Sequence, residues 1–255
     1  MGVLNLTPDS FYDGGRYVRL ERAIEAGRAM LEAGADMLDV GGESTRPGAA
    51  PVSERDEIAR VVPVIEALHG APISIDTMKP AVARAAFAAG AILWNDVGAL
   101  EAPGALQAAA ELKAPVALMH KRGEPRTMQE NPTYTDVVGE VIAYLKARAE
   151  TCERAGLKEI WVDPGIGFGK TLQHNLALIR ALPRIAAETG RPLLFGASRK
   201  SSIARLDPAA ALPRDRLGGS IAFALAAAEG GARMVRVHDV RETVQALRVW
   251  RALKA

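Results

Sequence analysis

The feature that most constrains the fold of this chain is a repeated unit, in which a short apolar run is followed by a stretch with helical spacing. Eight such units follow one another in 255 residues. The apolar runs are mostly continuous, which is typical of parallel strands buried on both faces. The repeat predicts an α/β fold with a single domain over residues 1–255, a (β/α)₈ barrel with its active site at the carboxyl ends of the strands. A doubly wound open sheet is the alternative.

The repeat also gives approximate bounds for each element. The expected strands cover residues 2–7, 37–42, 73–77, 92–97, 116–120, 160–163, 192–198 and 234–238. The expected helices cover residues 20–33, 53–68, 80–89, 103–112, 135–155 and 172–188, with helical turns through 228 and a last helix from 241. The strands end on polar residues, which we expect to line one mouth of the barrel: Asn5, Asp39, Asp76, Asn95, His120, Asp163, Ser198 and His238.

The charge balance and the cysteine content exclude several classes of protein. The 32 basic and 30 acidic residues give a formal net charge of +2, and no long run of one sign occurs, which disfavours nucleic acid as a partner. Cys152 is the only cysteine and cannot form an internal disulfide, and the four histidines lack zinc-type spacing. The N-terminal residues resemble neither a signal peptide nor a membrane anchor. We expect a cytoplasmic protein that acts on small-molecule substrates.

A glycine-rich stretch at residues 163–170 (Asp-Pro-Gly-Ile-Gly-Phe-Gly-Lys) follows the sixth expected strand. Gly165, Gly167 and Gly169 can take positive φ and let a ligand approach the backbone. A phosphate-binding P-loop needs four residues between its glycines, whereas three lie between Gly165 and Gly169. The spacing also differs from that of the dinucleotide-binding fingerprint. A purely structural glycine turn is the alternative.

The strand ends predict a substrate with two chemical parts. Asp76, Asn95 and Asp163 would present mostly acceptor oxygens, which suit a flat heterocycle with several N–H donors, such as a 2-amino-4-oxo-pyrimidine. Taken alone, each acid could equally be a capping or ion-pair residue. Cations lie near the same strand ends: Arg46, Arg199, Lys200, Arg236 and His238. Because cations around a polyoxyanion stabilise a leaving phosphate or diphosphate, the second part of the substrate is expected to be anionic.

Seven segments together resemble the dihydropteroate synthase family. They are residues 5–11 (Asn-Leu-Thr-Pro-Asp-Ser-Phe), 42–48 (Gly-Glu-Ser-Thr-Arg-Pro-Gly), 75–77 (Ile-Asp-Thr), 95–96 (Asn-Asp), 163–170, 198–201 (Ser-Arg-Lys-Ser) and 236–239 (Arg-Val-His-Asp). The likeness runs from end to end. It implies a transferase of folate biosynthesis that condenses 6-hydroxymethyl-7,8-dihydropterin diphosphate with 4-aminobenzoate, gives 7,8-dihydropteroate and diphosphate, is a sulfonamide target and forms a homodimer.

The resemblance also implies a role for individual residues. The pterin would be held by Asp76, Asn95, Met119, Asp163 and Lys200. The diphosphate would be met by Asn5, together with Mg²⁺, and by Arg46, Arg236 and His238. The aminobenzoate site would be framed by Phe11, Thr45, Pro47, Phe168 and Ser201. The catalytic residues would be Asp13, Lys200 and Arg236, with Asp13 facing the pterin-methyl cation.

The implied mechanism is departure of diphosphate before attack by the amine, so no strong general base is required. The loops at about residues 7–16 and 42–51 would close over the site. Four features depart from the family pattern. The chain begins almost on its first expected strand, so either the barrel floor is open or the leading segment that usually covers it lies outside the numbered chain. The loop at residues 120–123 is more basic than expected, Tyr12 replaces a small residue and Ile166 replaces an aromatic one.

Two rival functions share the pterin site. A pterin-dependent methyltransferase domain with a corrinoid partner has the same barrel and the same Asp-Asn-Asp floor, but has no use for residues 45–48 or 198–201. A pterin-binding or scaffolding relative without turnover is the other.

Overall fold

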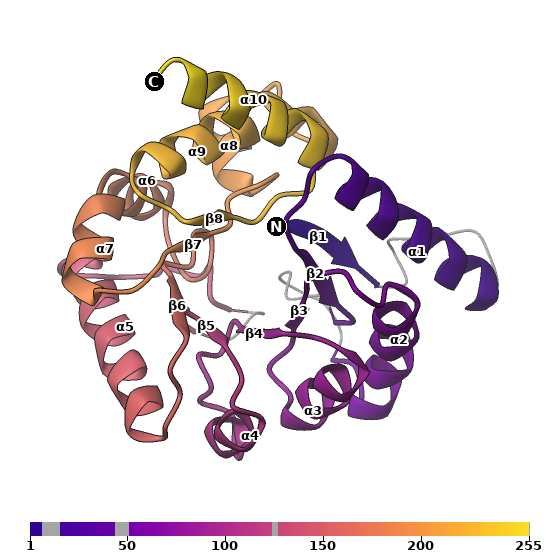
Figure 1. Ribbon diagram of the computed structural model, residues 1–255. Helices are drawn as coiled ribbons and strands as arrows, with labels where there is room; N and C mark the ends of the chain where they lie inside the picture. Colours follow the sequence, from indigo (N-terminus) through magenta and orange to yellow (C-terminus); the bar gives the residue numbers. More distant parts are fainter. Residues whose placement is uncertain (7–15, 44–50, 124–126, 255) are drawn as a thin grey trace.

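The computed structural model describes residues 1–6, 16–43, 51–123 and 127–254, in which eight short parallel strands form a ring surrounded by helices (Figure 1). The strands are β1 (Gly2–Asn5), β2 (Leu38–Gly41), β3 (Ile73–Asp76), β4 (Leu93–Asp96), β5 (Val116–Met119), β6 (Ile160–Asp163), β7 (Leu194–Phe195) and β8 (Met234–Val235). Strands β1 to β6 pair in sequence order, and β7 pairs with β8.

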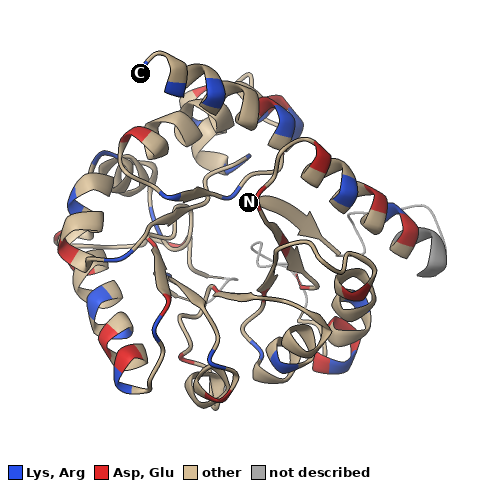
Figure 2. Ribbon diagram, in the orientation of Figure 1, with Lys and Arg blue, Asp and Glu red and all other residues tan. Residues whose placement is uncertain are grey.

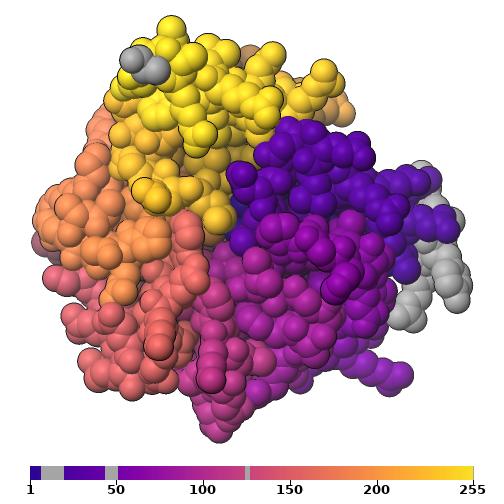
Figure 3. Space-filling model, in the orientation of Figure 1, coloured from indigo at the N-terminus to yellow at the C-terminus, as the bar shows by residue number. Residues whose placement is uncertain are grey.

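The helices follow the strands around the outside of the ring. They are α1 (Arg16–Glu32), α2 (Glu54–Ala67), α3 (Pro80–Ala89), α4 (Ala105–Leu112), α5 (Val137–Arg154), α6 (Leu172–Arg180), α7 (Leu182–Thr189), α8 (Ser201–Leu206), the 3₁₀ turn η2 (Pro213–Arg216), α9 (Leu217–Glu229) and α10 (Val240–Ala252). The first and last units lie side by side (Figure 3), and a Cβ at Gly34, just after α1, would lie 3.2 Å from the Val244 side chain of α10.

Two backbone bridges close the ring. Gly2 pairs with Val237 and Val162 pairs with Leu193, both in parallel. The amide of Val3 donates to the Val237 carbonyl oxygen over 2.9 Å. Strand β1 therefore neighbours β8, and β6 neighbours β7. The (β/α)₈ barrel predicted from the repeat is confirmed, and the doubly wound alternative is wrong because it would leave two free edges.

Alternate residues of each strand face the helices or the barrel interior, as strand geometry requires. On β4, Trp94 is fully buried in the layer between strands and helices, and its indole nitrogen donates to the Thr77 carbonyl oxygen over 2.7 Å. The lower barrel is filled by the buried residues Met1, Leu93, Ala117 and Leu194, and the partly buried Met37, Trp161 and Met234 pack against them. Each large apolar side chain buried in this way stabilises the fold by about 1.5–3 kcal/mol. This cluster forms the floor beneath the polar strand ends.

One expected helix and two expected strands differ from the structure. The expected helix 172–188 is two helices, α6 and α7, which meet at Ala181, because Pro183 in the first turn of α7 has no amide to continue a single helix. The expected strands 192–198 and 234–238 keep only two ladder residues each. Beyond the ladder, the amide of His238 donates to the Ser198 hydroxyl over 3.2 Å, so a side chain replaces the backbone acceptor.

Charged residues of both signs are interspersed over the outer helices, while the ring of strands carries few (Figure 2). This distribution agrees with the near balance of acids and bases in the sequence. Among the described helices, none combines the length and the apolar character that crossing a membrane requires.

Candidate active site at the carboxyl ends of the strands

A guanidinium group joins carboxylates from two other strands inside the barrel. Arg236, directly after β8, places Nε 2.5 Å from Asp39 Oδ2 and Nη2 2.6 Å from Asp76 Oδ2. Asn95 Nδ2 donates to the same Asp39 oxygen over 3.1 Å. These residues, called here the Arg236 cluster (Asp39, Asp76, Asn95 and Arg236), come from β2, β3, β4 and the segment directly after β8. The closed barrel therefore brings together groups that lie up to 197 positions apart in the chain.

Burial sets the protonation chemistry of the Arg236 cluster. Burial raises the pKa of Asp76 to about 7, although Arg236 opposes that shift. Desolvation also acts on Arg236, but the neighbouring carboxylates prevail and raise its pKa, so the guanidinium is charged at all relevant pH values. Asp39 is fully buried, and its Oδ1 has no hydrogen-bond partner among the described residues. Asp39 was expected to line the mouth; it lies lower and holds Arg236 and Asn95.

Asp163 and Lys200 form the opposite side of the mouth. A Cβ at Gly196 would lie 3.7 Å from Arg236 Cβ and 3.9 Å from Asp163 Oδ2, so these two side chains flank the same glycine. Burial raises the pKa of Asp163, with Lys200 the strongest opposing influence. Burial lowers the pKa of Lys200 to about 8, with Asp163 opposing. Lys200 Nζ lies 4.4 Å from the centre of the Phe168 ring and donates to the Ile166 carbonyl oxygen.

The glycine-rich stretch packs directly on the segment that follows β5. Gly165 has φ of 69°, and a Cβ there would lie 1.8 Å from the His120 carbonyl oxygen. Gly169 has φ of 64°, and its Cβ would lie 2.1 Å from the Arg122 carbonyl oxygen. Both positions require glycine for conformation and for space. Asp163 Oδ1 accepts from the Gly165 amide over 2.7 Å, so this turn also fixes the carboxylate.

Gly165→Ala should destabilise the fold more than Gly156→Ala, which is the matched control. Gly156 also has positive φ, 92°, but nothing lies within 4 Å of its Cβ position. The control isolates the conformational cost, roughly 1–2 kcal/mol. The overlap with His120 should add about 1–3 kcal/mol at Gly165. Unfolding in urea measures both, and equal losses for the two variants would contradict the close contact.

A cavity of about 490 Å³ opens above the Arg236 cluster, a volume typical of small-molecule sites. The predicted site residues that line it are Asn5, Asp76, Phe168, Lys200, Ser201, Arg236 and His238. His238 Nδ1 lies 3.0 Å from Ser198 Oγ. Arg199 also lines the cavity and forms a salt bridge with Asp239. Acceptors and cations therefore border one cavity.

Three predicted residues that the structure describes are not among those lining this cavity. Asn95, Met119 and Asp163 are buried at the strand ends, and Met119 is the register partner of Asp163. The other predicted residues lie outside the described part of the chain: Phe11, Asp13, Thr45, Arg46 and Pro47. Their roles stay predictions.

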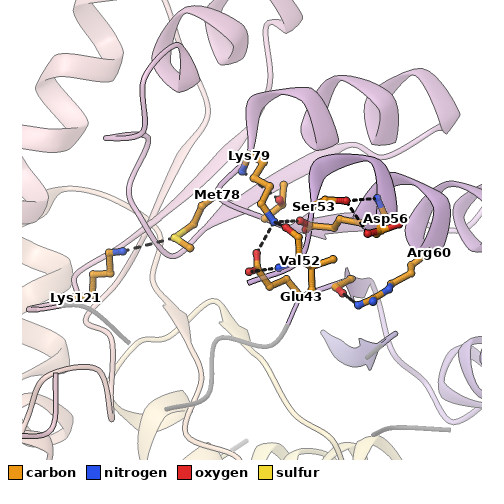
Figure 4. A network of polar contacts seen from close by, with 11 residues as sticks. Glu43, Val52, Ser53, Asp56, Arg60, Met78, Lys79 and Lys121 are labelled. Atoms are coloured by element: carbon orange, nitrogen blue, oxygen red, sulfur yellow. Dashed lines mark hydrogen bonds and ion pairs between the residues drawn. The ribbon is translucent and has the colours of Figure 1, made fainter. Parts of the chain in front are cut away.

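A half-buried ion-pair network that sequence reasoning missed lies beside the mouth (Figure 4). Lys79 Nζ lies 2.6 Å from Glu43 Oε2 and 2.6 Å from Glu57 Oε2, and donates to the Val52 carbonyl oxygen over 2.8 Å. Glu43 Oε1 accepts from the Val52 amide over 3.1 Å. Glu57 is fully buried on α2, one turn before Val61 on the same apolar face. The signal available in the sequence was Glu57, an acid on the otherwise apolar face of the expected helix, which indicates a buried partner of opposite charge.

Lys170 is the second residue whose role was missed. It is 1% exposed, and burial lowers its pKa to about 7. It faces His120, which was expected to line the mouth but is buried behind it, against the rings of Tyr134 and Tyr144, with Nδ1 2.9 Å from Lys170 Nζ. The position of Lys170 directly after the last glycine was the only signal in the sequence.

The described residues contain no group of three or more His, Cys, Asp or Glu side chains that could hold a metal ion. The only predicted metal ligand, Asn5, ends β1 and lines the cavity with a half-buried amide side chain.

Comparisons with known proteins agree with this geometry. The model of the family described as pterin binding enzyme matches residues 1–238. The chain is 50% identical over 254 residues to the dihydropteroate synthase of Escherichia coli strain K12, covering 98% of this chain and 89% of the relative. It superposes with a TM-score of 0.93 on the Yersinia pestis dihydropteroate synthase with a sulfonamide drug complex, at 46% identity, covering 100% of this chain and 93% of that one. A Xanthomonas albilineans dihydropteroate synthase with 4-aminobenzoic acid also has a TM-score of 0.93, at 50% identity, with 100% and 92% covered.

Proposed function

The chain belongs to the pterin binding enzyme family, and we propose that it acts as a dihydropteroate synthase. This transferase of folate biosynthesis condenses 6-hydroxymethyl-7,8-dihydropterin diphosphate with 4-aminobenzoate and releases diphosphate. The observation that carries the proposal is the Arg236 cluster, which sets buried acceptors beside cations at the bottom of one cavity. A substrate with a donor-rich heterocycle and an anionic tail matches both parts.

The pterin lies, in this proposal, between the Arg236 cluster and Asp163. Asp76 and Asp163 accept from the ring N–H groups, Asn95 accepts from a ring N–H group or donates to the ring oxygen, and Met119 lines the pocket beside Asp163. Lys200 donates to the pterin from the cavity side. Each hydrogen-bonding group left unpaired in this buried site would cost about 1–3 kcal/mol of binding free energy. The site therefore favours a heterocycle whose N–H groups match these acceptors over one that lacks them.

The catalytic step proceeds by charge stabilisation. The C–O bond between the pterin methylene and the diphosphate breaks first, and its electron pair leaves with the diphosphate. Arg236, Lys200 and His238 stabilise that anion because they are preorganised in a site of low dielectric constant. The lone pair of the aminobenzoate nitrogen then forms the new C–N bond, and the nitrogen loses a proton. Asp13 as the group facing the cation, and Arg46 as a diphosphate ligand, stay predictions.

Asn5 is proposed as the protein ligand of Mg²⁺. Mg²⁺ prefers oxygen donors and is commonly held by one or two side chains plus substrate phosphates and water. The Asn5 amide oxygen at the cavity wall fits that pattern, with the diphosphate supplying further oxygens. When bound, Mg²⁺ would supply positive charge against the departing diphosphate.

Aminobenzoate is proposed to enter beside Phe168 and Ser201, which line the outer cavity. The Phe168 ring offers a flat apolar face, and the Ser201 hydroxyl offers a hydrogen bond to the carboxylate. Sulfonamides, which resemble aminobenzoate in shape and charge, are expected to compete there. In the prediction from sequence, Phe11, Thr45 and Pro47 complete this site. Cytoplasmic localisation and a homodimer are further predictions from the sequence.

The acid side of the pH profile should report Asp76. Its pKa of about 7 means that protonation below that value turns an acceptor oxygen into a donor. We therefore expect kcat/KM for the pterin substrate to fall as the pH drops through about 7. Asp76→Asn should have low activity, and its kcat/KM should no longer fall as the pH drops through about 7. An unchanged limb in that variant would assign the titration to another group.

Diphosphate release tests the function directly. The purified chain with pterin diphosphate, aminobenzoate and Mg²⁺ should release one diphosphate for each dihydropteroate formed, and release should stop when aminobenzoate is omitted. A methyltransferase domain or a binding protein without turnover would release no diphosphate under either condition. That result would overturn the proposal.

A further inference from the structure

Lys170 occupies a closed cage of acceptors behind the active-site mouth. Its Nζ lies 2.9 Å from His120 Nδ1, 3.0 Å from the Gly165 and Phe168 carbonyl oxygens, and 3.2 Å from the His120 carbonyl oxygen. This side chain does not line the cavity, and it is 1% exposed. The ammonium therefore joins the end of β5 to the turn that follows β6, much as a bound cation would.

The cage suits the protonated amine. An ammonium has three donors and no acceptor, whereas four acceptors surround it. Because His120 Nδ1 must offer its lone pair, the imidazole is neutral with its proton on Nε2. Burial, followed by the charge of Lys170, lowers the pKa of His120 to about 3, so the ring stays neutral. The acceptor set and the neutral ring both favour a charged Lys170.

The segment held by Lys170 carries three contacts to the active-site lysine. The Ile166 carbonyl oxygen accepts from Lys200 Nζ, and the Phe168 ring lies 4.4 Å from that nitrogen. A Cβ at Gly167 would lie 3.1 Å from Lys200 Cδ, so the turn also packs on the lysine stem. A displacement of this turn would move the partners that aim Lys200.

We propose that Lys170 is a positioning residue, whose buried ammonium fixes the turn at residues 164–169 and through it orients Lys200 and Phe168. The importance of that orientation for turnover rests on the proposed function, whereas the role of Lys170 in fixing the turn is independent of it. The proposal explains why a lysine is buried without lining the cavity.

The charged and titratable groups that face Lys170 come from three elements. They are His120 after β5, Asp163 at the end of β6 and Lys200 before α8. Burial lowers the pKa of Lys170 to about 7, Asp163 raises it and Lys200 lowers it further. When the Lys170 ammonium loses a proton, only two N–H donors remain for the four acceptors, and the nitrogen lone pair faces one of the carbonyl oxygens. The turn should therefore loosen as the pH rises through about 7.

Lys170→Met removes the donors and keeps the volume, and Lys158→Met, at an exposed lysine just before β6, is the matched control. Amide hydrogen exchange in residues 164–169 should lose roughly 10- to 100-fold protection in Lys170→Met, because hydrogen bonds to a charged group are lost. Turnover should fall by about 100-fold in kcat, as expected of a misplaced catalytic group. The control should match the wild type in both.

The wild-type pH series is the second measurement and stands without any variant. After correction for the chemical exchange rate, protection of residues 164–169 should fall between about pH 6 and about pH 8.5, while that of α5 stays constant. The proposal would be overturned if protection of residues 164–169 in the wild type did not depend on pH. It would also be overturned if Lys170→Met had the same protection and the same kcat as the wild type. Because exchange is measured without substrate, a chain that does not release diphosphate would count against the proposed function alone.

Discussion

Asp163→Asn should lower kcat/KM for the pterin substrate by about a thousandfold or more, since a site built for hydrogen bonding rejects a mismatched partner strongly. The substitution keeps the shape of the side chain but places an NH₂ donor where the pterin requires an acceptor. It also removes the negative charge beside Lys200, which opposes the fall of the pKa of that lysine. Steady-state kinetics with varied pterin diphosphate measure the effect.

Asp36→Asn is the matched control for Asp163→Asn. Asp36 is an exposed acid before β2, at the amino end of the barrel strands and far from the mouth. Its replacement should leave kcat/KM unchanged. Near-normal kcat/KM in Asp163→Asn, with the fold intact by circular dichroism, would refute the pterin role of Asp163.

Arg236→Met should abolish turnover and also weaken the fold. Removal of the guanidinium leaves the carboxylates of Asp39 and Asp76 buried without their cation, and breaking a buried pair in this way costs about 3–5 kcal/mol. Burial already raises the pKa of Asp76 to about 7 while Arg236 opposes the shift, so removal of the Arg236 guanidinium should raise the pKa of Asp76 further. Denaturant unfolding and diphosphate release measure the two effects.

The sign of the pH dependence distinguishes this account of Arg236 from simple loss of packing. The folded state of Arg236→Met holds a proton on Asp76 that the unfolded state releases, so its stability decreases as the pH rises. The loss relative to wild type should be smaller at about pH 5.5 than at about pH 8.5. Arg233→Met, at an exposed arginine just before β8, should behave like wild type. An equal loss at both pH values would contradict the ion-pair account.

Much of the fold could be predicted because it depends on periodicity. Eight apolar runs ending in polar residues define a parallel barrel, and the barrel fixes which side chains share the mouth. Asp76, Lys200 and Arg236 were found in this way. The break between α6 and α7 was missed, although Pro183 was visible, because the apolar pattern runs through it.

The second layer of the site could not be predicted because it depends on contacts across the barrel. Nothing local in the sequence indicates that Asp39 lies beneath the mouth and holds Arg236, 197 positions away. Lys170 and His120 are 50 positions apart, and nothing in the sequence pairs the two. Lys79 likewise meets Glu43 and Glu57 only after the helices pack. Such pairs become visible only once the strand register is known.

Calorimetric titration with 6-hydroxymethylpterin tests the central claim most directly, because it measures whether the acids and the amide at the strand ends hold one pterin. We predict one pterin bound per chain for the wild type and for Asp36→Asn, and no measurable binding for Asp163→Asn. Equal affinity in all three proteins would contradict the claim, because the heterocycle would then bind elsewhere than between Asp163 and the Arg236 cluster.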